Sequence, residues 1–175
     1  MQVLKSVTFV YATREDRILA AINAGHPEAW SCWLTRRLVL VLLERAAKLM
    51  ATTSPLAQRA PSEARGDIVA FERDAAIAHT AKAMSRTPPD LVKTSGTAAE
   101  LVDRLTIAPQ SGGNFRVELV GDSGGGAAGA VARSELQRIL QMLQGEVVKA
   151  GWLNAPANAP TAPAAEEPGP KPARH

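Results

Sequence analysis

The sequence is poor in cysteine and in aromatic residues. Cys32 is the only cysteine, so the chain cannot form an intramolecular disulfide, and this composition is compatible with a reducing cytoplasm. Aromatic residues make up 4% of the chain, whereas apolar residues make up 46%. The chain can therefore bury a core, and that core must consist mainly of aliphatic side chains and alanine.

The sequence also lacks a long apolar run. In the stretch WSCWLTRRLVLVLLERAAK, the aliphatic residues 38–43 lie between the pair Arg36 and Arg37 and the charged residues Glu44 and Arg45. A transmembrane helix needs roughly 20 apolar residues. The N-terminal stretch MQVLKSVTFVYATRED is too short and too β-branched for the apolar region of a signal peptide. We therefore expect a cytoplasmic protein that makes no membrane contact.

The first fifty residues predict three strands followed by a helix. β-Branched and aromatic residues in SVTFVY and the returning RILAAIN predict a hairpin over residues 6–23, with a polar tip at TRED. AWSCWL follows a turn with Gly25 and Pro27 and predicts a third strand. A helix is expected from about Thr35 to Met50, because this stretch lacks Pro and Gly and Thr35 is a suitable N-cap.

The rest of the chain predicts a middle helix, more strands and a last helix. Apolar residues at helical spacing indicate a helix over about residues 67–85, between two proline-containing connectors. ELVDRLTIAP and NFRVELVG predict two strands, followed by the loop DSGGGAAG and a short strand AVA. Arg133 to Ala150 predicts an amphipathic helix. The Pro/Ala-rich residues 154–175 predict a disordered tail.

The two ends of the chain match when the C-terminal part is moved back by 98 positions, which brings Ile107 onto Phe9. The matched order of elements indicates an internal duplication. We therefore predict an α+β fold with a single domain over residues 1–153. Two β-β-β-α halves, about 5–50 and 100–152, are joined in it by the middle helix.

The helix predicted over residues 35–50 is apolar nearly all round. Its main stripe contains Leu38, Val41 and Leu42, but Val39 and other apolar residues lie off that stripe. A helix of this kind is usually buried on more than one side. We therefore expect it at the centre of the fold, with Leu42 buried, or in a dimer interface.

The glycine-rich stretch from Gly121 to Gly129 resembles two known motifs. GDSGGG is similar to the nucleophile loop of chymotrypsin-like serine proteases, where Ser123 would be the nucleophile. His26 and His79 lack that family's context, and the chain is too short for its two barrels. GGGAAG fits the dinucleotide-binding fingerprint, but no second parallel strand with an acidic end follows it. We expect a loop that joins two strands.

No other group of residues predicts catalysis or metal binding. His26, His79 and His175 are scattered along the chain. Cys32, next to Trp33 on an apolar strand, fits a small buried hydrophobe better than a reactive thiol. We therefore predict no enzymatic activity, no catalytic residues, no metal and no cofactor.

A mild basic excess, with a net charge of +3, is the remaining functional signal. The candidate binding residues are Arg14, Arg17, Arg36, Arg37 and Arg116. The tandem sheet-plus-helix halves, over about residues 5–150, resemble in topology the Whirly and PUR-type single-strand nucleic-acid binders. That resemblance implies an open sheet face that binds nucleic acid with basic and aromatic side chains.

The segments EDRI and WLTRR are similar to segments of uncharacterised short bacterial proteins. This resemblance implies no activity, but it indicates that the charged residues of the two segments act together. Arg36 and Arg37 begin a predicted helix, where the helix dipole disfavours cations unless Glu15 or Asp16 reaches them. We predict a structural ion-pair network of these four residues, with an anion-binding patch as the alternative.

Two functions follow from these patterns. The first is a non-enzymatic protein–protein interaction or assembly module of the bacterial cytoplasm, which forms a homo-oligomer through its first helix. The alternative is a single-stranded nucleic-acid binding protein that uses basic sheet faces, which the mild positive charge permits without demanding.

Overall fold

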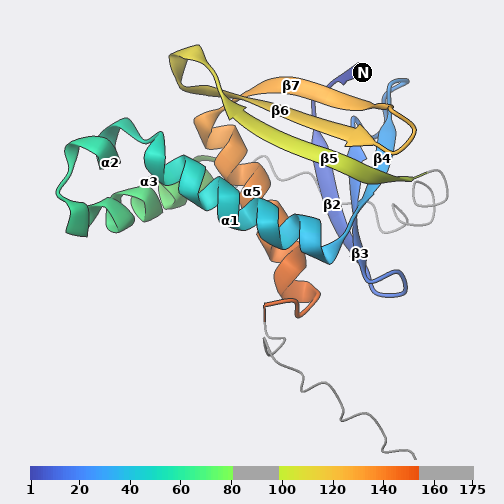
Figure 1. The fold of residues 1–175 in the computed structure, drawn as a ribbon, viewed down its shortest axis with the longest axis horizontal. Helices are drawn as coiled ribbons and strands as arrows, with labels where there is room; N and C mark the ends of the chain where they lie inside the picture. Colours follow the sequence, from blue (N-terminus) through green and yellow to red (C-terminus); the bar gives the residue numbers. More distant parts are fainter. Residues whose placement is uncertain (81–98, 154–175) are drawn as a thin grey trace, which may run out of the picture.

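The computed structural model describes residues 1–80 and 99–153, which form one seven-stranded sheet and a group of helices, so the predicted α+β class is confirmed (Figure 1). The strands are β1 (Gln2–Val3), β2 (Val7–Ala12), β3 (Arg17–Ile22), β4 (Trp30–Leu34), β5 (Glu100–Pro109), β6 (Asn114–Gly121) and β7 (Gly126–Ala132). The helices are α1 (Arg36–Thr52), α2 (Pro55–Arg59), α3 (Arg65–Thr80) and α5 (Arg133–Lys149), with short 3-10 turns η1 (Ser62–Ala64) and η3 (Ser111–Gly113). The predicted tail, residues 154–175, lies outside the described residues.

The strand order β1-β7-β6-β5-β4-β3-β2 places the first two strands at opposite ends of the sheet. β1 pairs in parallel with β7, and β2 pairs antiparallel with β3. Only residues 4–6 connect β1 to β2, and three extended residues span roughly 10 Å. The sheet must therefore curl until its two ends nearly meet, so that one face becomes the inside of an incomplete barrel.

Asn23 holds the two ends of the curled sheet together. Its side-chain oxygen accepts hydrogen bonds from the backbone N–H groups of Lys5 (2.9 Å) and Ser6 (3.1 Å). Its Nδ2 donates to the carbonyl oxygen of Val3 at 2.8 Å. Asn23 is fully buried and has a φ of 50°, a left-handed conformation that asparagine adopts more readily than most residues. The adjacent Leu4 N–H donates to the carbonyl oxygen of Ala128 in β7.

Helix α5 packs against the sheet, touching β2, β6 and β7, while α1 lies across α5 and also contacts α3 (Figure 1). The expectation that Leu42 is buried is wrong, although Val39 and Met50 of the same helix belong to the main core. On α1 the buried residues are Val39, Ala46 and Met50; Leu42 is only half-buried and Val41 is 38% exposed. A helix that is apolar on all sides has no sequence period that fixes its inner face.

Most element boundaries agree with the prediction, and the differences are local. Thr35 caps α1, and its side chain accepts a hydrogen bond from the Leu38 N–H. β7 begins at Gly126, so the predicted glycine loop is shorter and the last strand longer than expected. Helix α2 was missed, although Ser54 at its N-cap followed by Pro55 is a helix-start pattern. The middle helix begins at Arg65, and residues 81–85 of its predicted span lie outside the described residues.

The elements of the two halves recur at the predicted offset of 98. Moved by that number, β3 falls on residues 115–120 and α1 on residues 134–150, close to β6 and α5. The parallel pairing of β4 with β5 also has a counterpart in the parallel pairing of β7 with β1. The internal duplication stays a prediction, because shared element order does not demonstrate common origin and the two helices pack differently.

The inside of the curled sheet holds the main apolar core. Its largest fully buried side chains include Phe115, Ile18, Ile22 and Leu143. A smaller cluster on β2, β3 and β4 contains Ala12, Leu19, Ala21 and Trp33, with Leu101 and other partly buried residues packed against it. As expected from the composition, both clusters are mainly aliphatic. Among the described residues, no helix is both long and apolar enough to cross a membrane.

Candidate protein-binding groove

A groove lies between α1, α3 and α5 and is called here the three-helix groove. It has a volume of about 490 Å³, within the range of roughly 300–1,000 Å³ typical of binding pockets. The lining side chains are Leu40, Leu43, Glu44, Ala47 and Met50 of α1, Gly66, Val69, Ala70 and Arg73 of α3, Gln137, Leu140, Gln141 and Gln144 of α5, and Leu153.

Each helix contributes lining residues at intervals of three and four positions, such as 40, 43, 44 and 47 on α1 and 137, 140, 141 and 144 on α5. Residues at this spacing lie on one face of a helix. The groove is thus bounded by one face of each of three helices. The α1 face is apolar, whereas the α5 face is rich in glutamine.

The charged side chains that line the groove are Glu44 and Arg73, one on α1 and one on α3. Glu44 is paired with Lys48 at 2.7 Å, and Arg73 with Asp74 at 3.3 Å, all with exposed side chains. The side chain of Gln137 is buried, and its Nε2 finds no hydrogen-bond acceptor in the described part of the chain. Leaving such a donor unpaired costs about 1–3 kcal/mol. The contact between α5 and α3 beside the groove therefore contains one buried hydrogen-bond donor without an acceptor among the described residues.

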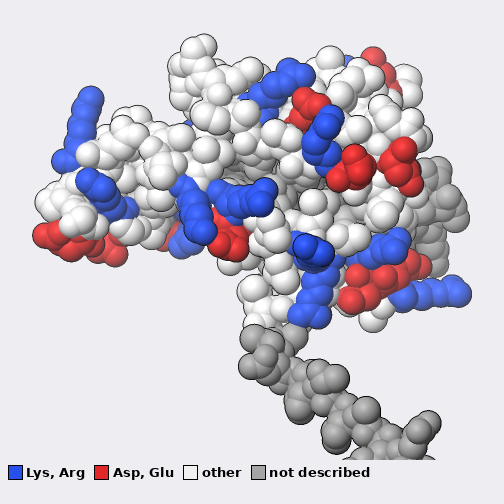
Figure 2. All heavy atoms as spheres, in the orientation of Figure 1, with Lys and Arg blue, Asp and Glu red and all other residues white. Residues whose placement is uncertain are grey.

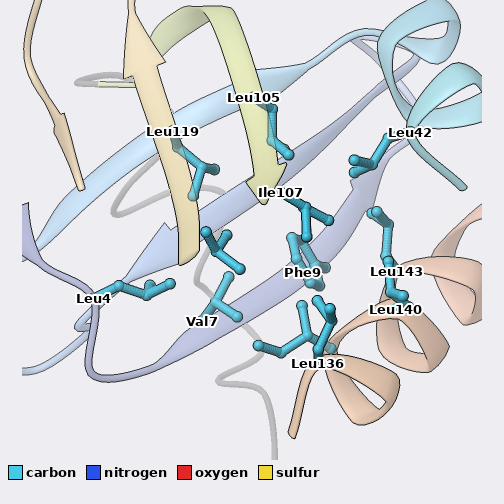
Figure 3. Close-up of a pocket in the computed structure, with 12 residues that line it drawn as sticks. Leu4, Val7, Phe9, Leu42, Leu105, Ile107, Leu119, Leu136, Leu140 and Leu143 are labelled. Carbon is cyan, nitrogen blue, oxygen red and sulfur yellow. The ribbon is translucent and has the colours of Figure 1, made fainter. Parts of the chain in front are cut away.

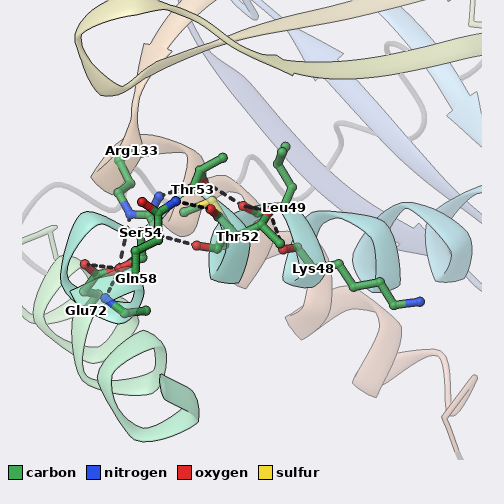
Figure 4. A network of polar contacts seen from close by, with 10 residues as sticks. Lys48, Leu49, Thr52, Thr53, Ser54, Gln58, Glu72 and Arg133 are labelled. Carbon is green, nitrogen blue, oxygen red and sulfur yellow. Dashed lines mark hydrogen bonds and ion pairs between the residues drawn. The ribbon is translucent and has the colours of Figure 1, made fainter. Parts of the chain in front are cut away.

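A polar network holds the far end of the groove (Figure 4). Arg133, in the first turn of α5, donates to the Met50 carbonyl at the end of α1 and to Thr53 Oγ1 at 3.0 Å. Its Nη2 also lies 3.0 Å from Glu72 Oε2 of α3, and Ser54 Oγ donates to Glu72 Oε1 at 2.9 Å. One arginine thus ties together all three helices that form the groove.

The apolar cavity inside the curled sheet is a packing defect of the core (Figure 3). Phe9 and Ile107 of the sheet and Leu42, Leu140 and Leu143 of the helices surround it, and every lining side chain is apolar. Its volume is about 30 Å³, far below the roughly 150 Å³ of an engineered protein cavity that holds benzene. It has neither the size nor the polar groups of a ligand site.

The five predicted binding arginines lie on several elements: Arg14 at the tip between β2 and β3, Arg17 on β3, Arg36 and Arg37 on α1, and Arg116 on β6. Arg14, Arg17 and Arg37 are exposed. Arg116 lies on β6, 3.6 Å from Glu118 Oε2, and Arg36 points its Nη2 at the Trp152 carbonyl at 3.1 Å. On the face in Figure 2, basic and acidic side chains alternate among uncharged surface, so that face has no field of one sign.

The predicted network of Glu15, Asp16, Arg36 and Arg37 takes a different form. In the described part of the chain these carboxylates and guanidinium groups make no direct ion pair. Asp16 Oδ1 accepts hydrogen bonds of 2.9 Å from Trp152 Nε1 and from the Tyr11 hydroxyl. Those two bonds, helped by the nearby charge of Arg36, lower the pKa of Asp16.

Trp152 therefore joins the hairpin tip to the start of α1. Its ring meets that of Tyr11 edge to face, with centroids 5.7 Å apart. Its indole N–H binds Asp16, and its backbone carbonyl binds Arg36. Trp152 thus links Asp16 of the EDRI segment to Arg36 of the WLTRR segment, a connection that the sequences of the two segments did not reveal.

The GDSGGG stretch forms a cradle for a carboxylate of the same chain. Glu100 Oε2 accepts from the Ser123 N–H at 2.9 Å, and Glu100 Oε1 accepts from Trp30 Nε1 at 2.6 Å. A Cβ at Gly121 would lie 2.2 Å from the Glu100 side chain, so a larger residue there would displace the Glu100 carboxylate from its hydrogen bonds. The loop thus binds a carboxylate of the same chain through its backbone N–H.

Glu100 accepts hydrogen bonds from the hydroxyl and the backbone N–H of Ser123 and from the indole N–H of Trp30. These bonds lower the pKa of Glu100 to about 2. A carboxyl whose pKa falls below its ordinary 4.5 on folding stabilises the protein above pH 4.5 and loses that contribution as pH drops towards 2. We expect the urea midpoint of the protein to fall over this range.

Glu100→Gln should destabilise the protein at pH 7 and flatten this acid dependence. Glu28→Gln, which removes an exposed carboxylate paired with Lys5, is the matched control and should keep the acid dependence. Urea denaturation of the three proteins between neutral and acidic pH measures the effect. An identical acid dependence in wild type and Glu100→Gln would contradict the assigned role.

Comparison with known proteins gave no match to a family model, to a curated protein or to a solved structure. In the described residues no three metal-ligating side chains cluster together. The resemblances to EDRI-containing proteins and to Whirly and PUR-type binders therefore stay predictions. The three-helix groove was not predicted as a site, and its one sequence signal was the apolar surplus of the first helix.

Proposed function

We propose that the protein is a non-enzymatic assembly module that self-associates through α1 and the three-helix groove. The observation that carries this proposal is the groove itself, with apolar Leu40 and Leu43 only half-buried on one wall. Leu153, which is 57% exposed, extends the apolar surface at the rim. Exposed apolar surface bounded by polar residues is typical of protein-interaction sites.

The structure of α1 supports this proposal further. Only Val39, Ala46 and Met50 of this helix are buried, although the sequence is apolar nearly all round. Val41 is 38% exposed on another side of the helix. Covering such a surface with a second protein removes apolar area from water, worth about 25 cal/mol per Å² before the costs of association.

Single-stranded nucleic-acid binding is the less well supported alternative. That mode needs aromatic side chains on which bases can stack. Phe9, Trp33, Phe115 and Trp152 are buried, and Trp30 is half-buried with its N–H bound to Glu100. Among the described residues, Phe71 is the one exposed aromatic side chain, at 71%. Binding of a labelled oligonucleotide that weakens with salt would favour this alternative, because phosphate contacts release counterions.

We expect the molar mass in solution to rise with concentration from 18.5 kDa towards twice that value. Ala47→Glu should keep the protein monomeric, because it places a charge in the groove at an exposed helix position where glutamate disturbs the helix little. Light scattering coupled to size-exclusion chromatography measures the mass.

Ala78→Glu makes the same substitution at an exposed position of α3 that does not line the groove, so this variant should still associate. Thermal melts of both variants should match wild type, which separates loss of binding from loss of folding. A wild-type mass of one chain at every concentration would contradict self-association, and an associating Ala47→Glu variant would contradict the groove as its surface.

A further inference from the structure

We infer that the three-helix groove receives α1 of a second copy, antiparallel to the α1 of the first, in a two-fold symmetric dimer. This inference rests on the proposed self-association and names the element and the direction of the contact. A symmetric dimer uses the same surface on both subunits, so α1 must both form part of the groove and fill the groove of its partner.

α1 contributes more large apolar side chains to the groove wall than α3 or α5, since Leu40, Leu43 and Met50 line it, whereas the exposed Leu56 of α2 and Val148 of α5 do not. The apolar residues Leu136, Leu143 and Val147 of α5 are buried in the core, and the face that α5 turns to the groove is largely glutamine. On α3 the large exposed apolar residue is Phe71, which does not line the groove. A second α1 therefore offers the groove a complementary apolar surface.

The spacing of the apolar residues on α1 reads the same in both directions. Leu40, Leu43, Ala47 and Met50 follow one another at intervals of three, four and three. In an antiparallel pair centred on position 45, Leu43 of one copy lies level with Ala47 of the other, and Leu40 lies level with Met50, which is itself buried in its own subunit. Large residues thus meet a small one at the centre, which lets helices pack closely.

The charges on this face favour the antiparallel direction. Glu44 and Lys48 are exposed and one turn apart. In the antiparallel pair their levels differ by two residues, about 3 Å along the axis, so Glu44 of each copy is within reach of the partner's Lys48. A parallel pair would place Glu44 level with Glu44 and Lys48 level with Lys48, and these like charges would repel.

Single cysteines on α1 test both the contact and its direction. The native Cys32 does not interfere, because it is buried and burial raises the pKa of its thiol to about 12. Glu44→Cys lies next to the proposed two-fold axis, so a short bis-maleimide should join two copies into a covalent dimer. Arg37→Cys is exposed and precedes Leu40 by three positions, on the same face.

In the antiparallel dimer the two copies of position 37 are separated along the helix axis by the length of 16 residues, roughly 24 Å. Arg37→Cys should therefore stay uncrosslinked. Cross-linking at position 37 as well as 44 would overturn the antiparallel direction. A dimeric mass without cross-linking at position 44 would overturn the α1 contact while leaving self-association intact. A monomeric mass would contradict the proposed function itself. Wild type treated in the same way reports any reaction of Cys32.

Discussion

Arg133→Ala is expected to lower the free energy of unfolding by about 2–4 kcal/mol, since it breaks a mostly buried ion pair and leaves Glu72 unpaired. The side chains of Arg133 and Glu72 are only 19% and 14% exposed. Arg133 also satisfies the Met50 carbonyl at the end of α1, where backbone acceptors lack partners within the helix. The same change should loosen the walls of the three-helix groove.

Urea denaturation of a double-mutant cycle checks this prediction. Glu72→Gln in the Arg133→Ala background should cost much less than in wild type, because the unpaired charge is then absent. Arg138→Ala, on the same helix and paired with Glu135 at 3.7 Å in a more exposed setting, should cost about 0.5 kcal/mol or less. Equal costs for the two arginines would show that Arg133 does not join the helices.

Asn23→Ala is expected to cost about 2–4 kcal/mol. The change removes three hydrogen bonds between Asn23 and the segment that joins β1 to β2. The backbone groups of Val3, Lys5 and Ser6 lose their partner, and a buried group left unsatisfied costs about 1–3 kcal/mol. Alanine also adopts the left-handed conformation less readily than asparagine. Chemical denaturation at pH 7 measures the loss.

Asn23→Gly separates the two causes, because glycine accepts the φ of 50° without strain but makes no side-chain hydrogen bond. We expect it to recover only the backbone part of the loss. Asn114→Ala, at an exposed position, should change stability little. If Asn23→Gly were as stable as wild type, Asn23 would not hold the sheet ends together.

The sequence by itself determined the α+β class and most of the secondary structure. Alternating and β-branched runs such as VTFVYA and NFRVELVG have a period that fits only a strand, and Thr35 supplies a local cap that fits only a helix start. These signals act between residues close in the chain, so they can be read without knowing the fold.

Tertiary structure alone decided which helix is central and where the candidate site lies. The stripes on α1 and α5 both predict helices, but neither says which one lies against the sheet, because either apolar face could be buried there. The ion pair of Arg133 with Glu72 joins residues 61 positions apart, and the contact of Asp16 with Trp152 spans 136 positions.

The curl of the sheet likewise could not be predicted from patterns among residues close in the sequence. β1 has only two residues, too few for a strand pattern, yet its pairing with β7 brings the two ends of the sheet together. Asn23 looks like an ordinary turn residue in the sequence, and GDSGGG looks like a functional motif. Their roles depend on Val3 and Glu100, which only the folded chain brings beside them, because hydrogen bonds select partners by distance in space.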